Sequence, residues 1–262
     1  MASINNIKDL VSAYEKYLKE PTYKGKLTEI SEREVQSKSE IPLIEVSEHF
    51  DSEDNGQSRK ILFIGFNPSG ADLKYYSKHN TCKPNDVLIY KGNSNYYEAM
   101  NNFANDCGFN CYSELDVLGV VRKTQSDVVV HFMDNTSLYT TMLDIFLDAV
   151  KGIAPSVIIV ANAFVRKLFI AKANSLHCRP KKEDPVVRKL RNNHDLIHFY
   201  NRITLLANNN NGGYKLYIDK EPSFQLFFSC MLSGQRAIDL GNRENLIWLV
   251  RNYLMKGYGM KI

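Results

Sequence analysis

The chain has 262 residues, of which 44% are hydrophobic and 24% are charged, and its net charge is +4. This balance is typical of a globular protein with its own core and excludes a disordered chain, and no apolar stretch approaches the ~20 residues that a membrane-spanning helix needs. Since the N-terminus also lacks the apolar core of a signal peptide, we expect a cytoplasmic protein that does not bind membranes.

Residues 1–58 are expected to hold one helix and a polar linker. Apolar side chains recur at helical spacing over residues 3–20, and Pro21 ends the pattern. Residues 21–58 are polar and irregular. We expect this N-terminal part to pack on one large domain formed by residues 59–262, because a chain of this length usually builds a single core with appendages.

A buried strand runs directly into a polar turn at residues 61–72. Residues 61–64 (Ile-Leu-Phe-Ile) form the continuous apolar run of a parallel strand that is covered on both faces, and Gly65 allows a close approach of the backbone to its surroundings. Asn67 follows at the carboxyl end of this strand, where Pro68 shapes the turn. Ligands of open α/β sheets bind at this end of the strands, so the turn is a candidate site. An ordinary strand exit has the same pattern.

The segments that follow alternate between helix and strand patterns, which is typical of parallel strands joined by helical crossovers. We therefore expect an α/β fold: a three-layer α/β/α sandwich with a central, mainly parallel four-stranded sheet. The expected order is a loop at 67–93, a helix near 94–107, a strand at 115–121, a helix at 136–151, a strand at 156–161 and a helix at 163–173. The loop is too long for a bare connection and is a candidate functional loop.

Residues 201–219 interrupt this alternation. Two short apolar runs flank an Asn- and Gly-rich stretch at 208–213, which predicts a β-hairpin inserted before the last core strand at 224–231. A helix at 242–255 is expected to close the fold.

The charges are unevenly distributed along the chain. From Lys151 onward there are 18 Lys and Arg against 7 Asp and Glu, whereas the preceding part has 15 against 22. Such asymmetry is typical of a protein that offers one face to a polyanion such as DNA. An exposed charged loop without a partner is the alternative. The densest basic stretch, residues 179–191, includes Lys181, Lys182, Arg188 and Lys189.

Other chemistries lack their sequence signals. The five cysteines are odd in number and scattered, which favours reduced thiols. His194 and His198 have the i, i+4 spacing of metal ligands on a helix, but no carboxylate pattern accompanies them. The sequence also has no Walker loop, dinucleotide fingerprint or Gly-x-Ser-x-Gly elbow. We therefore expect neither a metal nor a cofactor.

The motif Gly65-Phe-Asn-Pro-Ser69 is the first of several segments whose order and character resemble the uracil-DNA glycosylase superfamily, and most closely its mismatch-specific uracil/thymine branch. That branch opens with a strand followed by Gly-x-Asn-Pro-Ser or Gly-x-Asn-Pro-Gly. The resemblance covers about residues 59–254. Its later segments are an aromatic, Gly- and Asn-rich loop at 90–97, the second strand with a polar exit at 115–124, the third strand at 154–163, and the fourth strand with a DNA-intercalating loop at 227–236.

The resemblance implies a DNA glycosylase without metal or cofactor, whose partner is single-stranded DNA or a duplex with a damaged or mismatched base. Asn67 would position the attacking water. We expect a monomer. The base pocket would be formed by Gly65, Phe66, Pro68, Ser69, Tyr90 and Tyr96, and the DNA-binding residues would be Ser233, Gly234, Gln235, Arg236, Lys181, Lys182, Arg188 and Lys189.

One segment departs from the family pattern. The family commonly has His-Pro-Ser or Asn-Pro-Ser after the fourth strand, whereas this chain has Met231-Leu232-Ser233. A histidine would stabilise the charge on a departing base, and a methionine cannot donate a hydrogen bond. Two hypotheses therefore stand: a glycosylase that relies on Asn67, and a catalytically silent nucleic-acid-binding protein of the same fold.

Overall fold

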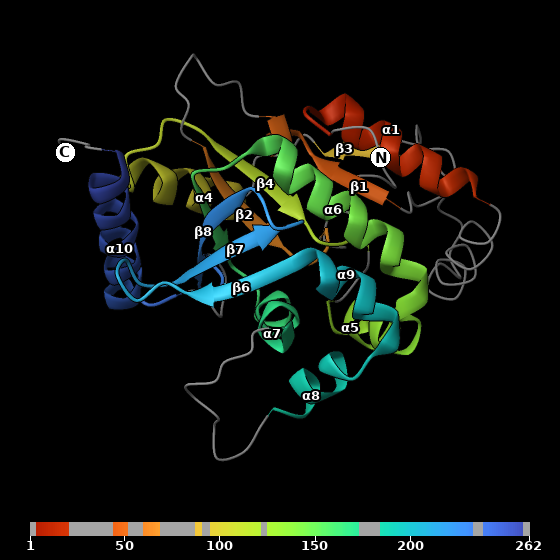
Figure 1. Cartoon of the computed structure of the whole chain (residues 1–262). Helices are drawn as coiled ribbons and strands as arrows, with labels where there is room; N and C mark the ends of the chain where they lie inside the picture. Colours follow the sequence, from red (N-terminus) through yellow and green to blue (C-terminus); the bar gives the residue numbers. More distant parts are fainter. Residues whose placement is uncertain are drawn as a thin grey trace.

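The computed structural model describes residues 4–20, 44–51, 60–68, 87–90, 95–121, 125–172, 184–232 and 238–258 (Figure 1). Helices and strands alternate over much of this range. The α-helices are α1 (Ile7–Lys19), α4 (Asn95–Asp106), α5 (Gln125–Asp134), α6 (Thr140–Ile153), α7 (Ala163–Lys172), α8 (Pro185–Arg191), α9 (Ile197–Arg202) and α10 (Leu240–Tyr258). The strands are β1 (Ile44–Ser47), β2 (Ile61–Gly65), β3 (Val87–Tyr90), β4 (Tyr112–Asp116), β5 (Val157–Val160), β6 (Ile203–Ala207), β7 (Tyr214–Ile218) and β8 (Ser223–Phe228), and the short 3-10 helices are η1 (Glu48–Asp51), η3 (Thr136–Tyr139) and η4 (His194–Leu196).

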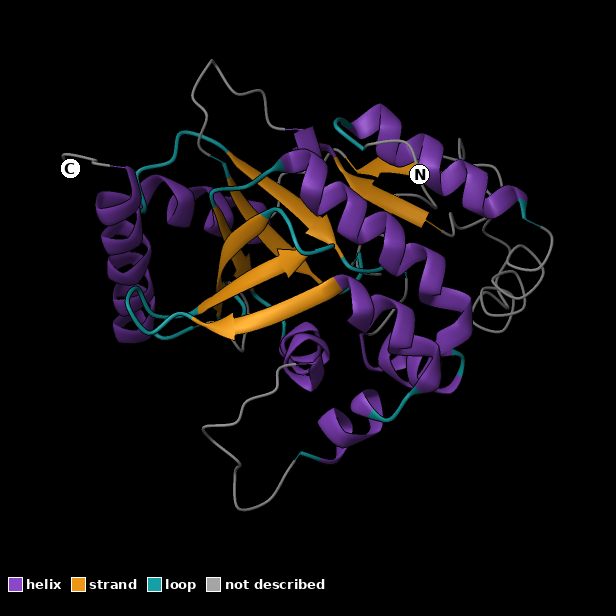
Figure 2. Ribbon diagram, in the orientation of Figure 1, coloured by secondary structure: helices purple, strands orange, loops and turns teal. Residues whose placement is uncertain are grey.

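The main sheet is mixed and mostly parallel. Its six strands lie in the order β4-β2-β5-β8-β7-β6, and the first four of these run parallel (Figure 2). The expectation of a central four-stranded sheet is corrected here. The hairpin predicted as an insertion at 201–219 adds two strands to this sheet, because β7 pairs antiparallel with β8 and carries β6 to the edge.

Helices flank this sheet, and two hydrophobic clusters pack against it. One joins side chains of α5, α6, α7 and α9 to Leu62 and Ile64 of β2, and α1 belongs to it as well. The other joins side chains of α4 and α10 to Ile61 and Phe63 of the same strand. All four β2 side chains are fully buried, which confirms the expectation from the continuous apolar run.

A second, two-stranded sheet lies beside the edge strand β4. Strands β1 and β3 pair in parallel, with Ser47 opposite Tyr90. The amide of Glu45 donates to the carbonyl of Gly119 at 2.8 Å, and Ile44 forms an antiparallel bridge with Val120. Strand β1 therefore runs back along the segment that follows β4.

Several boundaries differ from the sequence prediction. Strand β4 begins at Tyr112 and ends at Asp116, upstream of the apolar stretch at 115–121. Strand β1 falls in the expected linker, and β3 falls in the expected loop at 67–93. Helices α5, α8 and α9 were not predicted. An edge strand with polar neighbours does not show a long apolar run, and short helices that rely on tertiary packing carry weak periodicity.

The hairpin of β6 and β7 is fixed at both ends. Gln225 of β8 is 2% exposed; it donates to the carbonyl of Gly212 at 2.9 Å and accepts from Asn208 at 2.7 Å, so it clamps the tip. At the base, the guanidinium of Arg202 donates to carboxylates of α6 and to Asp219. Within the described residues no helix is long and apolar enough to span a membrane.

Candidate active site at the ends of β2 and β4

Asn67 lies just beyond β2, as the sequence predicts. The backbone pairing with the β4 side continues past both strands, because Val117 donates to the carbonyl of Gly65 at 3.1 Å and Leu118 to that of Phe66 at 2.9 Å. The Asn67 side chain donates through Nδ2 to the carbonyls of Pro68 at 2.8 Å and Val120 at 3.4 Å. This places the amide at the carboxyl ends of neighbouring parallel strands.

The other amide atom of Asn67 has no such partner. Its Oδ1 atom is buried and accepts no hydrogen bond from any residue that the structure describes. Buried acceptors of this kind are normally satisfied, and an unsatisfied one at a functional site needs an explanation. Since Nδ2 is held by two carbonyls, Oδ1 is the atom left to hold a water or a ligand.

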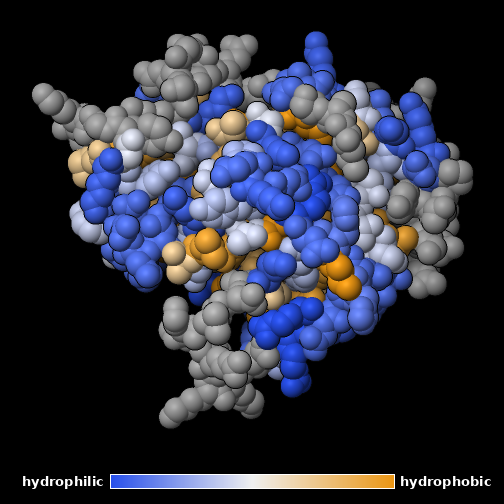
Figure 3. Space-filling view, in the orientation of Figure 1, coloured by the Kyte–Doolittle hydropathy of each residue, from blue (hydrophilic) through white to orange (hydrophobic). Residues whose placement is uncertain are grey.

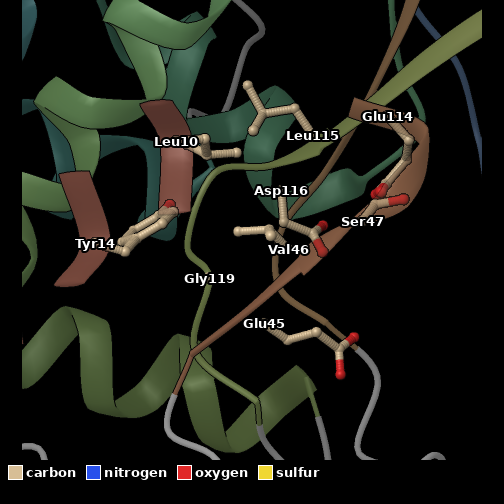
Figure 4. A pocket seen from close by; sticks show the side chains of 9 residues that line it. All are labelled: Leu10, Tyr14, Glu45, Val46, Ser47, Glu114, Leu115, Asp116 and Gly119. Carbon is tan, nitrogen blue, oxygen red and sulfur yellow. The ribbon is translucent and has the colours of Figure 1, made fainter. Parts of the chain in front are cut away.

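Two carboxyl groups stand on one side of β4 next to this turn. Glu114 and Asp116 are two residues apart, so their side chains point to the same face of the strand (Figure 4). Asp116 lies opposite Gly65 in the parallel register, and a Cβ atom on Gly65 would collide with Oδ1 of Asp116. The glycine is therefore needed to leave room for the Asp116 carboxyl.

These carboxyl groups line a small cavity between β4, β1 and α1 (Figure 4). Its volume is about 10 Å³, which is close to what one water molecule requires. Figure 4 shows the oxygen atoms of Glu114 and Asp116 directed toward Ser47, while Tyr14 approaches from α1. The lining residues are Leu10, Tyr14, Glu45, Val46, Ser47, Glu114, Leu115, Asp116 and Gly119.

Burial changes the acidity of these groups. Glu114 is 3% exposed, and loss of hydration raises its pKa to about 7, against a hydrogen bond from Ser47 that lowers it. Burial also raises the pKa of Asp116 well above its usual range, and the charges of Glu114 and Glu45 add to this effect. A carboxyl group that keeps its proton near neutral pH can both donate and accept a hydrogen bond.

Aromatic rings cover the side of the cluster that faces α4. Tyr90 stacks on Tyr97 with 5.8 Å between ring centroids, and Tyr96 meets Tyr97 edge-on at 5.4 Å. His49 of η1 lies 4.8 Å from Tyr97 and stacks on Tyr112 at 4.9 Å. Ser47 connects these rings to the carboxyl groups, because its hydroxyl bonds both Glu114 and Tyr97.

The chain matches no known family model and no curated protein.

The predicted pocket residues fall into different environments. Phe66 is 1% exposed and packs against Phe132 and Phe164, so its ring lies in the core and presents no open face to a ligand. Tyr90 is 9% exposed and belongs to strand β3 rather than to a loop. The structure thus brings Tyr90 and Tyr96 together through Tyr97 and sets Phe66 apart.

The predicted DNA-binding residues are only partly described. Arg188 and Lys189 are exposed on α8, and Lys189 lies 3.6 Å from Asp134. Met231 follows β8 and is 40% exposed. The predictions for Ser69, Lys181, Lys182, Ser233, Gly234, Gln235 and Arg236 lie outside the described residues.

Sequence reasoning missed the acidic part of the site. Glu45, Glu114 and Asp116 come from two different strands, and none was predicted as functional. The one available signal was the segment Tyr112-Ser-Glu-Leu-Asp116, where two carboxylates alternate with Ser113 and Leu115 as strand neighbours do. Among the described residues no three His, Cys, Asp or Glu side chains are arranged to hold a metal ion.

Proposed function

We propose that this chain is a DNA-glycosylase-like hydrolase that cleaves the N-glycosidic bond of uracil or a related damaged base flipped out of DNA. The observation that carries the proposal is the buried Oδ1 of Asn67 at the carboxyl end of β2, which accepts no hydrogen bond from a described residue. The proposal is supported by the parallel pairing of β4, β2, β5 and β8 within a sheet that helices flank. Ligands bind at such strand ends in open α/β sheets.

The chemistry requires an attacking water and a stabilised leaving base. Asn67 Oδ1 accepts a hydrogen bond from the water and so orients it toward C1′ of the sugar. The water oxygen forms the new bond to C1′ as the bond from C1′ to the base nitrogen breaks, and the water proton is released to the base or to solvent. An amide is no base, so this route suits bases that are already good leaving groups.

In this proposal, Asp116 provides the hydrogen-bond donor for the departing base that Met231 cannot provide. A methionine at the family's histidine position has no hydrogen-bond donor. Burial raises the pKa of Asp116 and so favours its protonated form, in which the carboxyl group can donate a hydrogen bond to a carbonyl oxygen of the departing base. The same group accepts from a neighbouring ring N–H. Donor and acceptor together fit the amide-like edge of uracil.

The direct test is a base-excision assay with the purified full chain. Oligonucleotides that carry uracil in a single strand, in a U:A pair and in a U:G pair are incubated with the protein and then cleaved by alkali at abasic sites. We expect strand cleavage that depends on both uracil and protein. Absence of cleavage in all three substrates, from a folded protein, would reject the hydrolase.

The second candidate is a catalytically silent protein of the same fold that binds nucleic acid. The specific observation in its favour is Met231, which replaces the expected histidine and is 40% exposed. The same oligonucleotides distinguish the two candidates, because the silent protein would bind the DNA but would release no uracil from it.

A further inference from the structure

Strand β6 forms an open edge of the main sheet. It is the last strand in the order β4-β2-β5-β8-β7-β6, and no described strand pairs with its outer side. In Figures 1 and 2 this strand runs along the front of the sheet, and helix α7, which contacts it, is drawn just below it. Edge strands expose unpaired backbone groups that can add another strand.

The ladder with β7 fixes which groups face outward. Asp219 donates to the carbonyl of Arg202 at one end, and Asn208 donates to the carbonyl of Gly213 at the other. Both pairs belong to the register in which Leu205 lies opposite Leu216. Even-numbered residues of this strand therefore bond inward, and the N–H and C=O groups of Leu205 and Ala207, with the C=O of Ile203, point to the open edge.

The strand itself carries none of the residues that usually protect such an edge. The strand reads Ile203-Thr-Leu-Leu-Ala207 and contains no charge and no proline. Natural edges are commonly blunted by a lysine, a proline or a bulge. Leu206 is 52% exposed, and Figure 3 shows a hydrophobic patch where β6 crosses the surface.

We propose that β6 pairs antiparallel with β6 of a second copy of this chain, so that the two main sheets join into one. A two-fold axis through Leu205 places the outward groups of the two strands opposite each other: Leu205 meets Leu205 of the second copy, and Ala207 meets Ile203 of the second copy. Every outward donor then finds an acceptor.

The side chains agree with this register. The same axis brings Leu206 opposite Thr204 of the second copy, on the open face of the sheet where both are exposed. The exposed leucine is thereby covered, and no like charges meet because the strand has none. This self-complementarity favours a second copy over an unrelated strand.

Sedimentation equilibrium of the full chain tests the proposal. The wild type should approach the mass of two chains at high concentration. Leu206→Lys should shift the equilibrium to one chain, since the axis sets the two new lysines close together in the interface. Ser223→Lys is the matched control. It adds the same charge to the same open face of the sheet, opposite Tyr217 and two strands from the edge. This variant should remain a dimer.

A cysteine pair tests the register itself. The double variant Thr204→Cys, Leu206→Cys places a cysteine opposite a cysteine in two symmetric, non-hydrogen-bonded pairs, within reach of a disulfide. Thr204→Cys alone leaves the two new thiols diagonal and too far apart. Mild oxidation should link the double variant into dimers and leave the single variant and the wild type, with its native cysteines, largely unlinked.

A wild type that stays monomeric at its highest soluble concentration would overturn the proposal. So would a dimer that persists in Leu206→Lys, or a double cysteine variant that links no better than the single one. Circular dichroism of each variant verifies that it is folded. Capture of an extended peptide by a monomeric wild type would assign the edge to a different partner and likewise reject the second copy.

Discussion

Gly65 and Asp116 face each other across the pairing of β2 with β4, and the space that a Gly65 side chain would fill is occupied by the Asp116 carboxyl group. The two residues are 51 positions apart in the sequence. Their proximity links the motif at the end of β2 to an acidic group that the motif alone does not reveal. It also allows the interaction between the two residues to be measured by a double-mutant cycle.

We predict that Gly65→Ala lowers the free energy of unfolding by about 1–3 kcal/mol, because the new methyl group must displace the Asp116 carboxyl. It should also reduce any base excision. In an Asp116→Ala background the same change should cost clearly less, since the next atom, Glu114 Oε1, is 3.6 Å from the added Cβ. Urea unfolding of the four proteins measures the coupling. Strictly additive effects would show that the two residues do not interact.

The buried carboxyl groups predict a particular pH dependence of stability. The pKa of Glu114 rises from 4.5 when free to about 7 in the folded chain. Between these values the folded protein holds more protons than the unfolded chain, so its stability falls as pH rises. Asp116 acts in the same direction.

Glu114→Gln removes one titrating group while keeping its shape. We expect the variant to gain stability relative to the wild type between about pH 5 and about pH 8, and to show a flatter dependence over this range. Urea unfolding at several pH values measures this. An unchanged slope would mean that Glu114 is ionised in the folded protein throughout.

Asn67→Ala should abolish base excision and leave the melting temperature nearly unchanged. The side chain lies at the strand exit, and its two hydrogen bonds, to the carbonyls of Pro68 at 2.8 Å and Val120 at 3.4 Å, hold the turn rather than the core, so we expect little stability to depend on it. Asn201→Ala, an exposed asparagine on α9, is the control and should behave as the wild type. Wild-type excision by the Asn67 variant would remove this residue from the mechanism.

The basic stretch should govern DNA binding through phosphate contacts. Replacing Lys181, Lys182, Arg188 and Lys189 by alanine should weaken binding to all sequences, and each lost contact should lower the slope of log affinity against log salt by about 0.7–0.9. The exposed lysines Lys8, Lys16 and Lys19 of α1 provide a control set. Fluorescence anisotropy over a salt series measures both. Equal losses in the two sets would point to a general charge effect.

Gln225→Leu should loosen the β6–β7 hairpin. The change leaves the Asn208 amide and the Gly212 carbonyl without the partners that they have at 2.7 and 2.9 Å, at a cost of about 1–3 kcal/mol. Hydrogen exchange should accelerate over residues 208–213. Lys215→Ala, at an exposed position of β7, should leave the exchange rates of the tip unchanged. Protection that survives in the Gln225 variant would show that the backbone ladder alone holds the tip.

Local sequence patterns determined several helices and strands of this protein and the position of the Asn67 turn. The apolar run of residues 61–64, its glycine and the Asn67 turn are contiguous, so their strand, its burial and the position of the turn at the carboxyl end follow from the sequence. The same holds for α1, α4, α7 and the two hairpin strands, whose observed ranges lie close to the expected ones. In each case the side chains that decide the element are neighbours in the chain.

Tertiary structure alone decided the acidic site and the extent of the sheet. Glu45, Glu114 and Asp116 converge because β1 folds back along the exit of β4, a pairing between segments about 70 residues apart that no periodicity encodes. The segment of β4 is polar in sequence, and its carboxyl groups become buried only when β1, α1 and α4 close over this edge of the sheet. Their raised pKa values follow from that burial, since the charge of an ionised side chain is costly only once water has been excluded from it.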